Sequence, residues 1–529
     1  MESMIREKVC LKWNEIFYYL FLLIMTIAKG SGLYEGMRLY NICLLLAGIC
    51  IFIKIVSEKY NILEFVLTGG AILISFLVYR NTGDQAALIY TAMIIGMKNI
   101  PIKRVFLLEG CVWCALFLCR SFLGMSGIYR GMALVHEKLG LGPMIRWSFG
   151  YPHPNVLQIT YAVLVAFILY NLNYKGKKLF KLLFMLFIGN CVVFLYSVSY
   201  TGFILTIGLL GVFLYFSIRE KRSKLENVFI QCILPASVLF AIGLPLAMEK
   251  GMPLRGLDLY MNKLFNTRFL ASRVFLYEGV KLFGTDVSQI GFALDCSYVY
   301  LLMKGGLVLF IFLLLGYFFL IRRYIRLDKR RELAIITTFL FAGISEPFLF
   351  NTSFKNITFF FLGEFLFEIL TEKQREISGI YRQRIGLVSS DSNACNISVI
   401  PLINLGLYIK RIWKRRKKFF CVAGAIITMA VYTFFQPFPH SIYVAVGNTD
   451  CGVREEFYLP GSSLENTDYR IYEYQGEQKP MYQFTGKTVE IEIFRDEISC
   501  IILGGIAGIF ILFIILSFKY SWKNEGSNQ

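Results

Sequence analysis

The sequence predicts an all-α polytopic membrane protein, in which residues 1–370 form a bundle of about twelve membrane-spanning helices and residues 419–529 add two more. Hydrophobic residues make up 56% of the 529 positions and charged residues only 17%, a balance that is unusual for a soluble domain. Apolar runs of spanning length recur from one end of the chain to the other. Because lipid offers the backbone no hydrogen-bond partners, such runs are satisfied only as helices.

Each apolar run is predicted to be one helix. The runs cover residues 15–28, 37–53, 62–79, 85–97, 105–122, 155–172, 179–197, 201–218, 228–248, 294–320, 333–350, 355–370, 419–436 and 498–518. The run at 85–97 is short, which leaves a tilted, a re-entrant and a longer helix open. The first run is followed by Lys29 and Gly30 without a small-residue cleavage pattern, so we expect it to stay as the first span.

The distribution of Lys and Arg predicts the orientation of the bundle. Six alternate connections, beginning with the amino-terminal segment, hold 22 Lys and Arg in 57 residues, whereas the other six hold 14 in 111 residues. Because cytoplasmic loops are enriched in positive charge, the first set is predicted to lie inside. We therefore expect a multi-pass protein of the bacterial plasma membrane with both termini in the cytoplasm. The net charge of +19 is then a topology signal, and no nucleic-acid partner is expected.

The lengths of the connections predict where function resides. The outer connections 123–154 and 249–293 are long, and long loops in a compact bundle usually carry function. Residues 371–418 form a basic cytoplasmic linker, whose final Lys and Arg cluster either fixes the orientation of the next span or binds anionic lipids. Residues 437–497 form a polar outer segment between the last two spans. The two-span appendix, residues 419–529, is open to three interpretations: a sensor of chain length, a site that recruits a partner, or a passive fusion.

Several kinds of chemistry are disfavoured by the sequence. It contains no phosphate-binding loop, no dinucleotide-binding glycine pattern and no zinc-binding HExxH motif, and it has only three His residues. We therefore expect no cofactor and no metal. The 13 Cys are scattered, and Cys111 and Cys114 lie inside a predicted span, where they are interpreted as packing residues.

The first long outer loop places polar side chains just before the sixth span, in the stretch from Arg146 to Asn155, with Arg130 earlier in the loop. His153 lies between two prolines, which keep the backbone extended and hold the imidazole at the membrane surface. A fixed imidazole suits proton transfer. The alternative is a loop histidine that caps the next helix.

The second long outer loop contains Asn266, Arg268 and Arg273. If this stretch is a helix, the two arginines point about 140° apart, so they do not grip one phosphate from one face. Arginine suits a diphosphate because its planar fork makes paired, charge-assisted hydrogen bonds and keeps its proton. The alternative is that these arginines extend toward lipid phosphates. The outer side is otherwise poor in positive charge, which favours a dedicated role for them and for Arg146.

The short outer loop after the eleventh span contains Glu346, Asn351 and Asn356. Glu346 precedes a proline at the end of an apolar run, where partial burial would raise its pKa and make it a base; an ordinary helix-end carboxylate is the alternative. Asp295 and Tyr298 open the tenth span, where they bind sugar hydroxyls or, for Asp295, cap the helix.

Together these segments resemble the O-antigen and capsular polysaccharide polymerases, the Wzy-type family, which is related in fold to the O-antigen ligases. The resemblance covers roughly residues 10–370 and rests on the Arg146 to Asn155 stretch, the Ser-Tyr-Thr-Gly turn at 199–202, the Asn266 to Gly284 segment and the polar residues that follow. Two features depart from the family. Tyr200 stands where many relatives carry an arginine, and residues 371–529 extend beyond the usual twelve spans.

The resemblance implies an inverting glycosyl transfer from an undecaprenyl-diphosphate oligosaccharide to another lipid-linked chain, without metal. Arginines of the outer loops would stabilise the leaving diphosphate, and either His153 or Glu346 would be the base. The residues expected to take part in catalysis are Arg146, His153, Arg268, Arg273 and Glu346. Those expected to bind substrate are Arg130, Asn155, Asn266, Asp295, Tyr298, Asn351 and Asn356. Expected partners are the lipid-linked substrate, membrane lipids, and a flippase and chain-length regulator of the same pathway.

Three other functions stay open. A ligase of the same fold would move a finished glycan onto a different acceptor. A flippase or transporter of lipid-linked sugars would carry its charges near the membrane centre rather than in outer loops. A structural scaffold would give no reason for arginines on the positive-poor side.

Overall fold

The chain folds mainly into helices that follow the predicted apolar runs. The computed structural model describes residues 9–129, 133–137, 143–219, 221–248, 255–265, 267–291, 293–376, 384–386, 395–397, 419, 422–431, 434, 442–445, 470–474, 477–484 and 487–525. The bundle helices are α1 (Trp13–Gly30), α2 (Arg38–Val56), α3 (Ile62–Thr82), α4 (Ala86–Gly96), α5 (Ile102–Met125), α6 (Pro154–Asn171), α7 (Gly176–Ser197), α8 (Tyr200–Ile218), α9 (Lys224–Val238), η2 (Leu239–Gly243), α10 (Leu244–Ala247), α13 (Ser297–Tyr300), η3 (Leu301–Gly305), α14 (Gly306–Arg326), α15 (Arg330–Ala342) and α16 (Thr358–Glu376).

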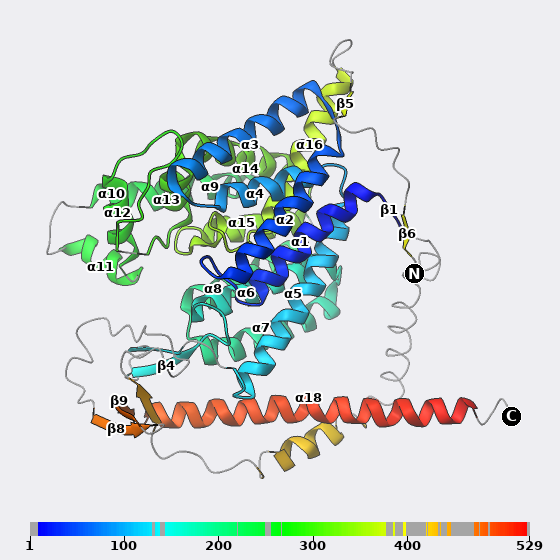
Figure 1. Ribbon diagram of the computed structural model, residues 1–529, viewed down its shortest axis with the longest axis vertical. Helices are drawn as coiled ribbons and strands as arrows, with labels where there is room; N and C mark the ends of the chain where they lie inside the picture. The colour runs from blue at the N-terminus through cyan, green and yellow to red at the C-terminus, as the bar shows by residue number, and fades with distance from the viewer. Residues whose placement is uncertain are drawn as a thin grey trace.

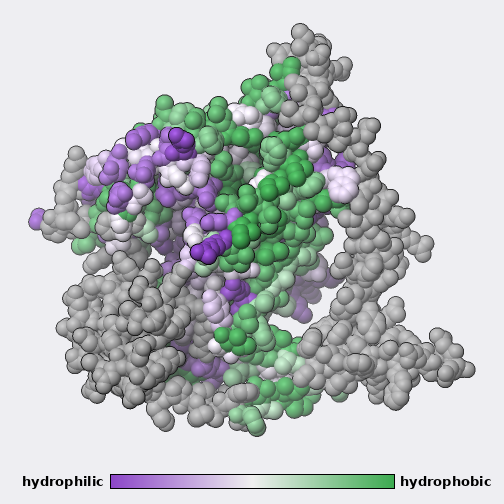
Figure 2. All heavy atoms as spheres, in the orientation of Figure 1, coloured by the Kyte–Doolittle hydropathy of each residue, from purple (hydrophilic) through white to green (hydrophobic). Residues whose placement is uncertain are grey.

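Every predicted span before residue 371 thus has a helical counterpart, and the prediction of a multi-pass α-helical membrane protein is confirmed at this level. Among the described residues, eight helical segments are long and apolar enough to cross a membrane. They are Arg38–Val56, Ile62–Thr82, Ile102–Met125, Pro154–Asn171, Gly176–Ser197, Tyr200–Ile218, Lys224–Ala247 and Ser297–Arg326. The larger number of fourteen spans stays a prediction. Figure 2 shows hydrophobic surface over α1, α2 and α5, and hydrophilic residues gathered at the end of the bundle that carries α10 to α13.

Local chemistry sets several helix ends. The side chain of Asn61 accepts a hydrogen bond from the backbone N–H of Glu64, and the Glu64 carboxylate accepts one from the backbone N–H of Asn61, a capping box that starts α3. Ser223 and Glu226 make the same arrangement at the start of α9. The eleventh run, predicted over 333–350, is helical only to Ala342, because a short 3-10 turn, η4 (Pro347–Leu349), follows at the proline.

The short run at 85–97 forms α4, which is only 11 residues long and almost wholly buried. The residues on either side of it bind the two ends of α4 to neighbouring helices. Asp84 before it pairs with Lys304 at 3.0 Å, and Lys98 after it pairs with Glu64. A helix of this length is about 16 Å long, shorter than the roughly 30 Å hydrocarbon core of a bilayer. That α4 crosses the membrane stays a prediction.

The long outer loops contain regular structure that the sequence analysis predicted only in part. Strands β3 (Ala133–Glu137) and β4 (Pro143–Trp147) form an antiparallel hairpin, which was not predicted. The second loop contains α11 (Gly256–Leu264) and α12 (Arg268–Tyr277), and α12 confirms the expected helix around the two arginines. Figure 1 shows β4 and α10 to α12 at one end of the molecule, opposite β1, β5 and β6.

Two small antiparallel sheets join segments predicted for the inner side. Strand β1 (Val9–Leu11) pairs with β6 (Cys395–Ile397), and β2 (Lys59–Asn61) pairs with β5 (Arg384–Gly386). The two strands described within the predicted linker 371–418, β5 and β6, therefore pair with the α2–α3 connection and with the amino-terminal segment. The cytoplasmic placement of these segments stays a prediction.

The predicted appendix contains a three-stranded sheet and a long helix. Strands β7 (Ile442–Ala445), β8 (Arg470–Tyr474) and β9 (Glu477–Phe484) pair in the order β7-β9-β8. Helix α18 (Lys487–Glu525) begins before the predicted span at 498, so the predicted outer segment 437–497 ends partly in helix. A shorter apolar helix at Val422–Val431 packs on α18, where a Cβ added to Gly504 would lie 2.8 Å from the Thr428 Cα. Such close approach at small residues is typical of paired membrane helices.

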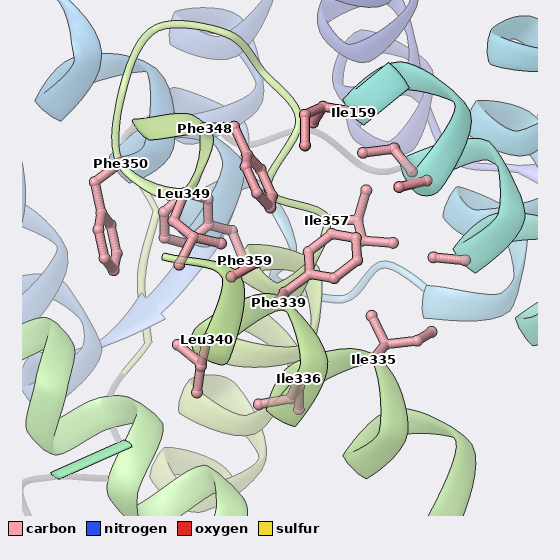
Figure 3. Close-up of a cluster of buried hydrophobic side chains, with 14 of the residues drawn as sticks. Ile159, Ile335, Ile336, Phe339, Leu340, Phe348, Leu349, Phe350, Ile357 and Phe359 are labelled. Carbon is pink, nitrogen blue, oxygen red and sulfur yellow. The ribbon is translucent and has the colours of Figure 1, made fainter. Parts of the chain in front are cut away.

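The hydrophobic core runs through the bundle from α1 to α16, and one part of it lies beneath the loop between α15 and α16. Figure 3 shows Phe348, Leu349 and Phe350 of this loop among side chains of α15 and α16. The Phe339 and Phe348 rings meet edge to face with centroids 5.5 Å apart, a favourable geometry for aromatic pairs. Because these aromatic residues are buried, they fix the backbone of the loop in which Glu346 lies, two residues before Phe348.

Candidate active site

Arg146 on β4 is buried, and two polar groups fix its guanidinium group by hydrogen bonds. Its Nε donates a 2.8 Å hydrogen bond to the backbone carbonyl of Ser197 at the end of α7, and its Nη2 donates a 2.5 Å bond to the Oδ1 of Asn155 in the first turn of α6. Its exposed fraction is 5%. Two predicted site residues, Arg146 and Asn155, are therefore in direct contact.

A buried polar network lies behind Arg146. The Ser197 hydroxyl donates a 2.7 Å bond to Gln158, whose amide donates a 2.7 Å bond to Asn190. The turn at the start of α8 packs on this network, since a Cβ added to Gly202 would lie 2.6 Å from Gln158 Cγ. Buried polar groups that are satisfied in this way fix a single arrangement, so the carbonyl that Arg146 binds has little freedom.

His153 is the N-cap of α6. Its Nδ1 accepts a 3.1 Å hydrogen bond from the backbone N–H of Asn155, so the capping alternative from the sequence describes its geometry. With Nδ1 as an acceptor, the neutral ring carries its proton on Nε2. A proton-accepting role would require His153 to give up the cap, which makes Glu346 the better placed of the two predicted bases.

Arg268 is the first residue of α12 and joins two carboxylates. Its Nε donates to Asp295 at 3.1 Å and its Nη2 donates to Glu346 at 3.3 Å. Burial acts to lower the pKa of Arg268, but the Glu346 and Asp295 carboxylates outweigh it and the net shift is upward. Arg268 therefore keeps its charge and links the second long loop to the loop after α15.

Glu346 lies almost wholly buried, and its side chain is 6% exposed. Its Oε1 accepts hydrogen bonds from the Thr201 hydroxyl and from Arg268, and its backbone carbonyl accepts a 2.5 Å bond from the Ser297 hydroxyl. Burial raises the pKa of Glu346, and Arg268 opposes the rise only in part. Among the described residues Oε2 has no hydrogen-bond partner, so this carboxyl combines a raised pKa with a free acceptor oxygen.

Arg146, Arg268, Glu346 and Asp295 form one electrostatic unit, which we name the arginine–glutamate site. Burial lowers the pKa of Arg146 to about 10, Glu346 opposes this shift and the positive charge of Arg268 adds to it. Arg146 therefore remains charged at neutral pH. These groups come from four separate segments, and Tyr200, at the position where the resemblance predicted an arginine, also acts electrostatically on Arg146.

Lys355 is a further cation beside this site that the sequence analysis did not single out. It is 4% exposed, and burial lowers its pKa to about 7, with Lys29 adding to the shift and Glu346 opposing it. The signal in the sequence was a lysine in a short connection on the predicted positive-poor side. It was overlooked because it stands in an otherwise uncharged stretch.

Two other predicted residues, Arg273 and Tyr298, make described hydrogen bonds to groups outside the arginine–glutamate site. Arg273 is buried on α12, where its Nε donates to the Tyr277 hydroxyl at 3.2 Å. The Tyr298 hydroxyl donates to the Leu340 carbonyl at 2.5 Å. The predicted roles of these two residues remain predictions.

The two asparagines of the last outer loop shape the backbone. The Asn356 amide donates to the Leu349 carbonyl at 2.9 Å, and its Oδ1 accepts from the Thr358 N–H at 3.2 Å, so it sets the start of α16. Asn351 accepts from the Ser353 N–H at 3.0 Å, a local turn. Their predicted contacts with substrate remain predictions. Arg130 and Asn266 lie outside the described residues.

The chemistry available at this site is anion binding beside a base. Two guanidinium groups offer charge-assisted hydrogen bonds to phosphate oxygens, and Lys355 adds positive charge nearby. A buried carboxyl with a raised pKa is suited to accept a proton from a hydroxyl. Comparison of the chain with protein-family models, with curated proteins and with solved structures finds no match.

Proposed function

We propose that this protein polymerises undecaprenyl-diphosphate-linked oligosaccharide repeat units into a surface polysaccharide, at the outer face of a bacterial plasma membrane. The arginine–glutamate site would hold the diphosphate of the donor through Arg146 and Arg268. Glu346 would accept the proton of the acceptor hydroxyl. The reaction needs no cofactor in this scheme.

One observation carries the proposal. Arg146 and Arg268 come from the two long loops, 123–154 and 249–293, and both interact with the carboxylate of Glu346 in a third. Buried charges are unfavourable unless they are paired or serve a ligand. Asp295, the second carboxylate, balances the arginines at rest, and a bound diphosphate would replace part of that negative charge.

The proposed step balances as an inverting displacement. The acceptor hydroxyl passes its proton to Glu346, and its oxygen forms a bond to the anomeric carbon of the donor sugar. The bond between that carbon and the diphosphate oxygen breaks, and its electron pair leaves with the diphosphate. Guanidinium groups that meet this oxygen stabilise the charge that develops there, which lowers the barrier.

The test is to delete the gene and identify the lipid-linked species that accumulate. A polymerase deletion leaves single repeat units on undecaprenyl diphosphate at the outer face. Long unattached chains would instead show a ligase, and single units retained at the inner face would show a flippase. Restoration of polymer by the wild-type gene, but not by Glu346→Gln, links the phenotype to the site. Glu278→Gln, a change at an exposed carboxylate, is the matched control.

A further inference from the structure

The first turns of α18 dock on the bundle through a polar stripe. Val489, Glu492, Arg495 and Ser499 are each less than 5% exposed, and their spacing places them on one helix face. Three of the four are polar, so the contact is specific rather than merely hydrophobic. The Tyr196 hydroxyl meets this stripe, at 2.8 Å from the Arg495 carbonyl and 2.7 Å from the Ser499 hydroxyl.

Arg495 ties together the two segments that hold Arg146. Its Nη1 donates a 2.6 Å bond to the carbonyl of Ile145 on β4, and its Nε donates a 2.7 Å bond to the carbonyl of Leu195 on α7. Arg146 follows Ile145 directly and bonds the carbonyl of Ser197, two residues after Leu195. Both arginines therefore bridge the same strand and the same helix end.

Glu492 completes the contact from the other side of Arg146. It forms an ion pair with Arg495 and accepts a 3.0 Å bond from the Trp147 indole N–H. Successive side chains of a strand point to opposite faces. Trp147 thus faces α18, whereas Arg146 faces the arginine–glutamate site, and residues on both sides of Arg146 contact α18.

We propose that Arg495 and Glu492 are positioning residues, which hold β4 so that Arg146 stays aligned with Arg268 and Glu346. This inference rests on the proposed function for its consequence, which is that affinity for a diphosphate depends on the carboxy-terminal helix. The appendix is then a working part of the site rather than a passive fusion. Removal of either partner leaves a buried charge without its counterpart and loosens the strand.

The experiment uses the full chain in lipid nanodiscs, with two readouts. Hydrogen–deuterium exchange of residues 133–147 reports how firmly the hairpin is held. Titration with undecaprenyl diphosphate gives both the affinity and the number of sites per chain. The variants are Arg495→Gln, the milder Glu492→Gln, the conservative Arg495→Lys and, as a matched control, Glu490→Gln at an exposed position of the same helix.

We expect Arg495→Gln and Glu492→Gln to speed exchange in the hairpin and to weaken binding about tenfold or more, because a misplaced binding group loses most of its contribution. The number of sites should stay the same, whereas a folding defect would reduce the number rather than the affinity. Arg495→Lys should recover part of the affinity, and Glu490→Gln should behave as wild type.

Two results would overturn the inference. Unchanged exchange in Arg495→Gln and Glu492→Gln would show that α18 does not hold the hairpin, and faster exchange with unchanged affinity would show that Arg146 does not depend on it. Failure of the wild type to bind undecaprenyl diphosphate counts against the proposed function instead. The exchange readout still decides whether α18 holds β4 in that case.

Discussion

Arg268 and Arg273 are the same residue type on the same helix, but they have different hydrogen-bond partners. The family resemblance implied a catalytic role for both arginines. Arg268 meets Asp295 and Glu346, whereas Arg273 donates to Tyr277 one turn along the same helix. Their separation of five residues turns them to different faces of α12, as the helical angle predicts. We therefore expect Arg268 to matter more for diphosphate binding.

The pH dependence of activity should follow Glu346. Its pKa is raised, chiefly by burial, and a base works only when deprotonated. Polymerisation should therefore fall as the pH drops through this raised pKa, above the range of an exposed glutamate. Glu346→Gln should reduce the rate about 100-fold or more, the usual contribution of a positioned base. The rate of polymer formation by purified protein between pH 4 and pH 8 checks this. A full rate in Glu346→Gln would remove Glu346 from the mechanism.

Lys355 should make anion binding pH-dependent at higher pH. Because its pKa is lowered to about 7, the ammonium is charged below that pH and neutral above it. Affinity for undecaprenyl diphosphate should therefore decline as the pH rises through about 7. Lys355→Met should bind more weakly at low pH and lose this slope, while Lys355→Arg should bind well throughout. An identical slope in Lys355→Met and wild type would contradict the assignment.

At the scale of elements, apolar periodicity predicts where helices lie better than it predicts what the loops do. Helix α12 was expected, but which arginine meets Glu346 depends on where the helix begins. Thr267 has φ +64° and turns the chain there, a conformation that no sequence pattern marks. The β3–β4 hairpin was missed because its strands are short. Its contact with α18 joins residues about 350 positions apart, beyond any local signal.

The loop from α12 to α13 should be sensitive to one glycine in particular. Gly284 has φ +85°, and a Cβ there would lie 2.4 Å from the Lys304 carbonyl, whereas Gly279 has φ +80° with open space around it. Gly279→Ala should cost about 1 kcal/mol from backbone strain alone. Gly284→Ala should lower thermal stability further, because the backbone at Lys304 must move. Thermal unfolding of both variants in detergent checks this, and equal effects would contradict the close packing.

At the scale of the whole molecule, the proposed function requires that both long loops lie on the outer face of the membrane. Exposed leucines offer a matched pair for cysteine labelling, Leu257 on α11 and Leu225 on α9. In intact cells an impermeant maleimide should label Leu257→Cys. Leu225→Cys should react only after permeabilisation, because it lies at the start of α9, directly after the connection 219–224 that is predicted to be inside. Labelling in the reverse order would place the arginine–glutamate site on the cytoplasmic face and exclude the proposed donor.

The composition and charge pattern predict the class of the molecule because both follow from the lipid environment, which acts on every span alike. The arginine–glutamate site depends instead on how four segments meet. The sequence predicted the residue types of this site. It also predicted that they lie on the same side of the membrane, because they come from loops predicted to be outside or, for Asp295, from the outer end of the tenth span. It did not supply the pairing of Arg268 with Glu346, the cap made by His153 or the nearby Lys355, which arise only from packing.

The most direct measurement is the affinity of the full chain in nanodiscs for undecaprenyl diphosphate, which requires no knowledge of the sugars. Arg146→Ala and Arg268→Ala should each weaken binding about tenfold or more, since charge-assisted hydrogen bonds contribute about 1.5–3 kcal/mol. Arg255→Ala, which removes an exposed arginine of the same outer loop as Arg268, should leave the affinity unchanged. Equal affinity in all three variants and the wild type would contradict the proposal that the buried arginines bind a diphosphate.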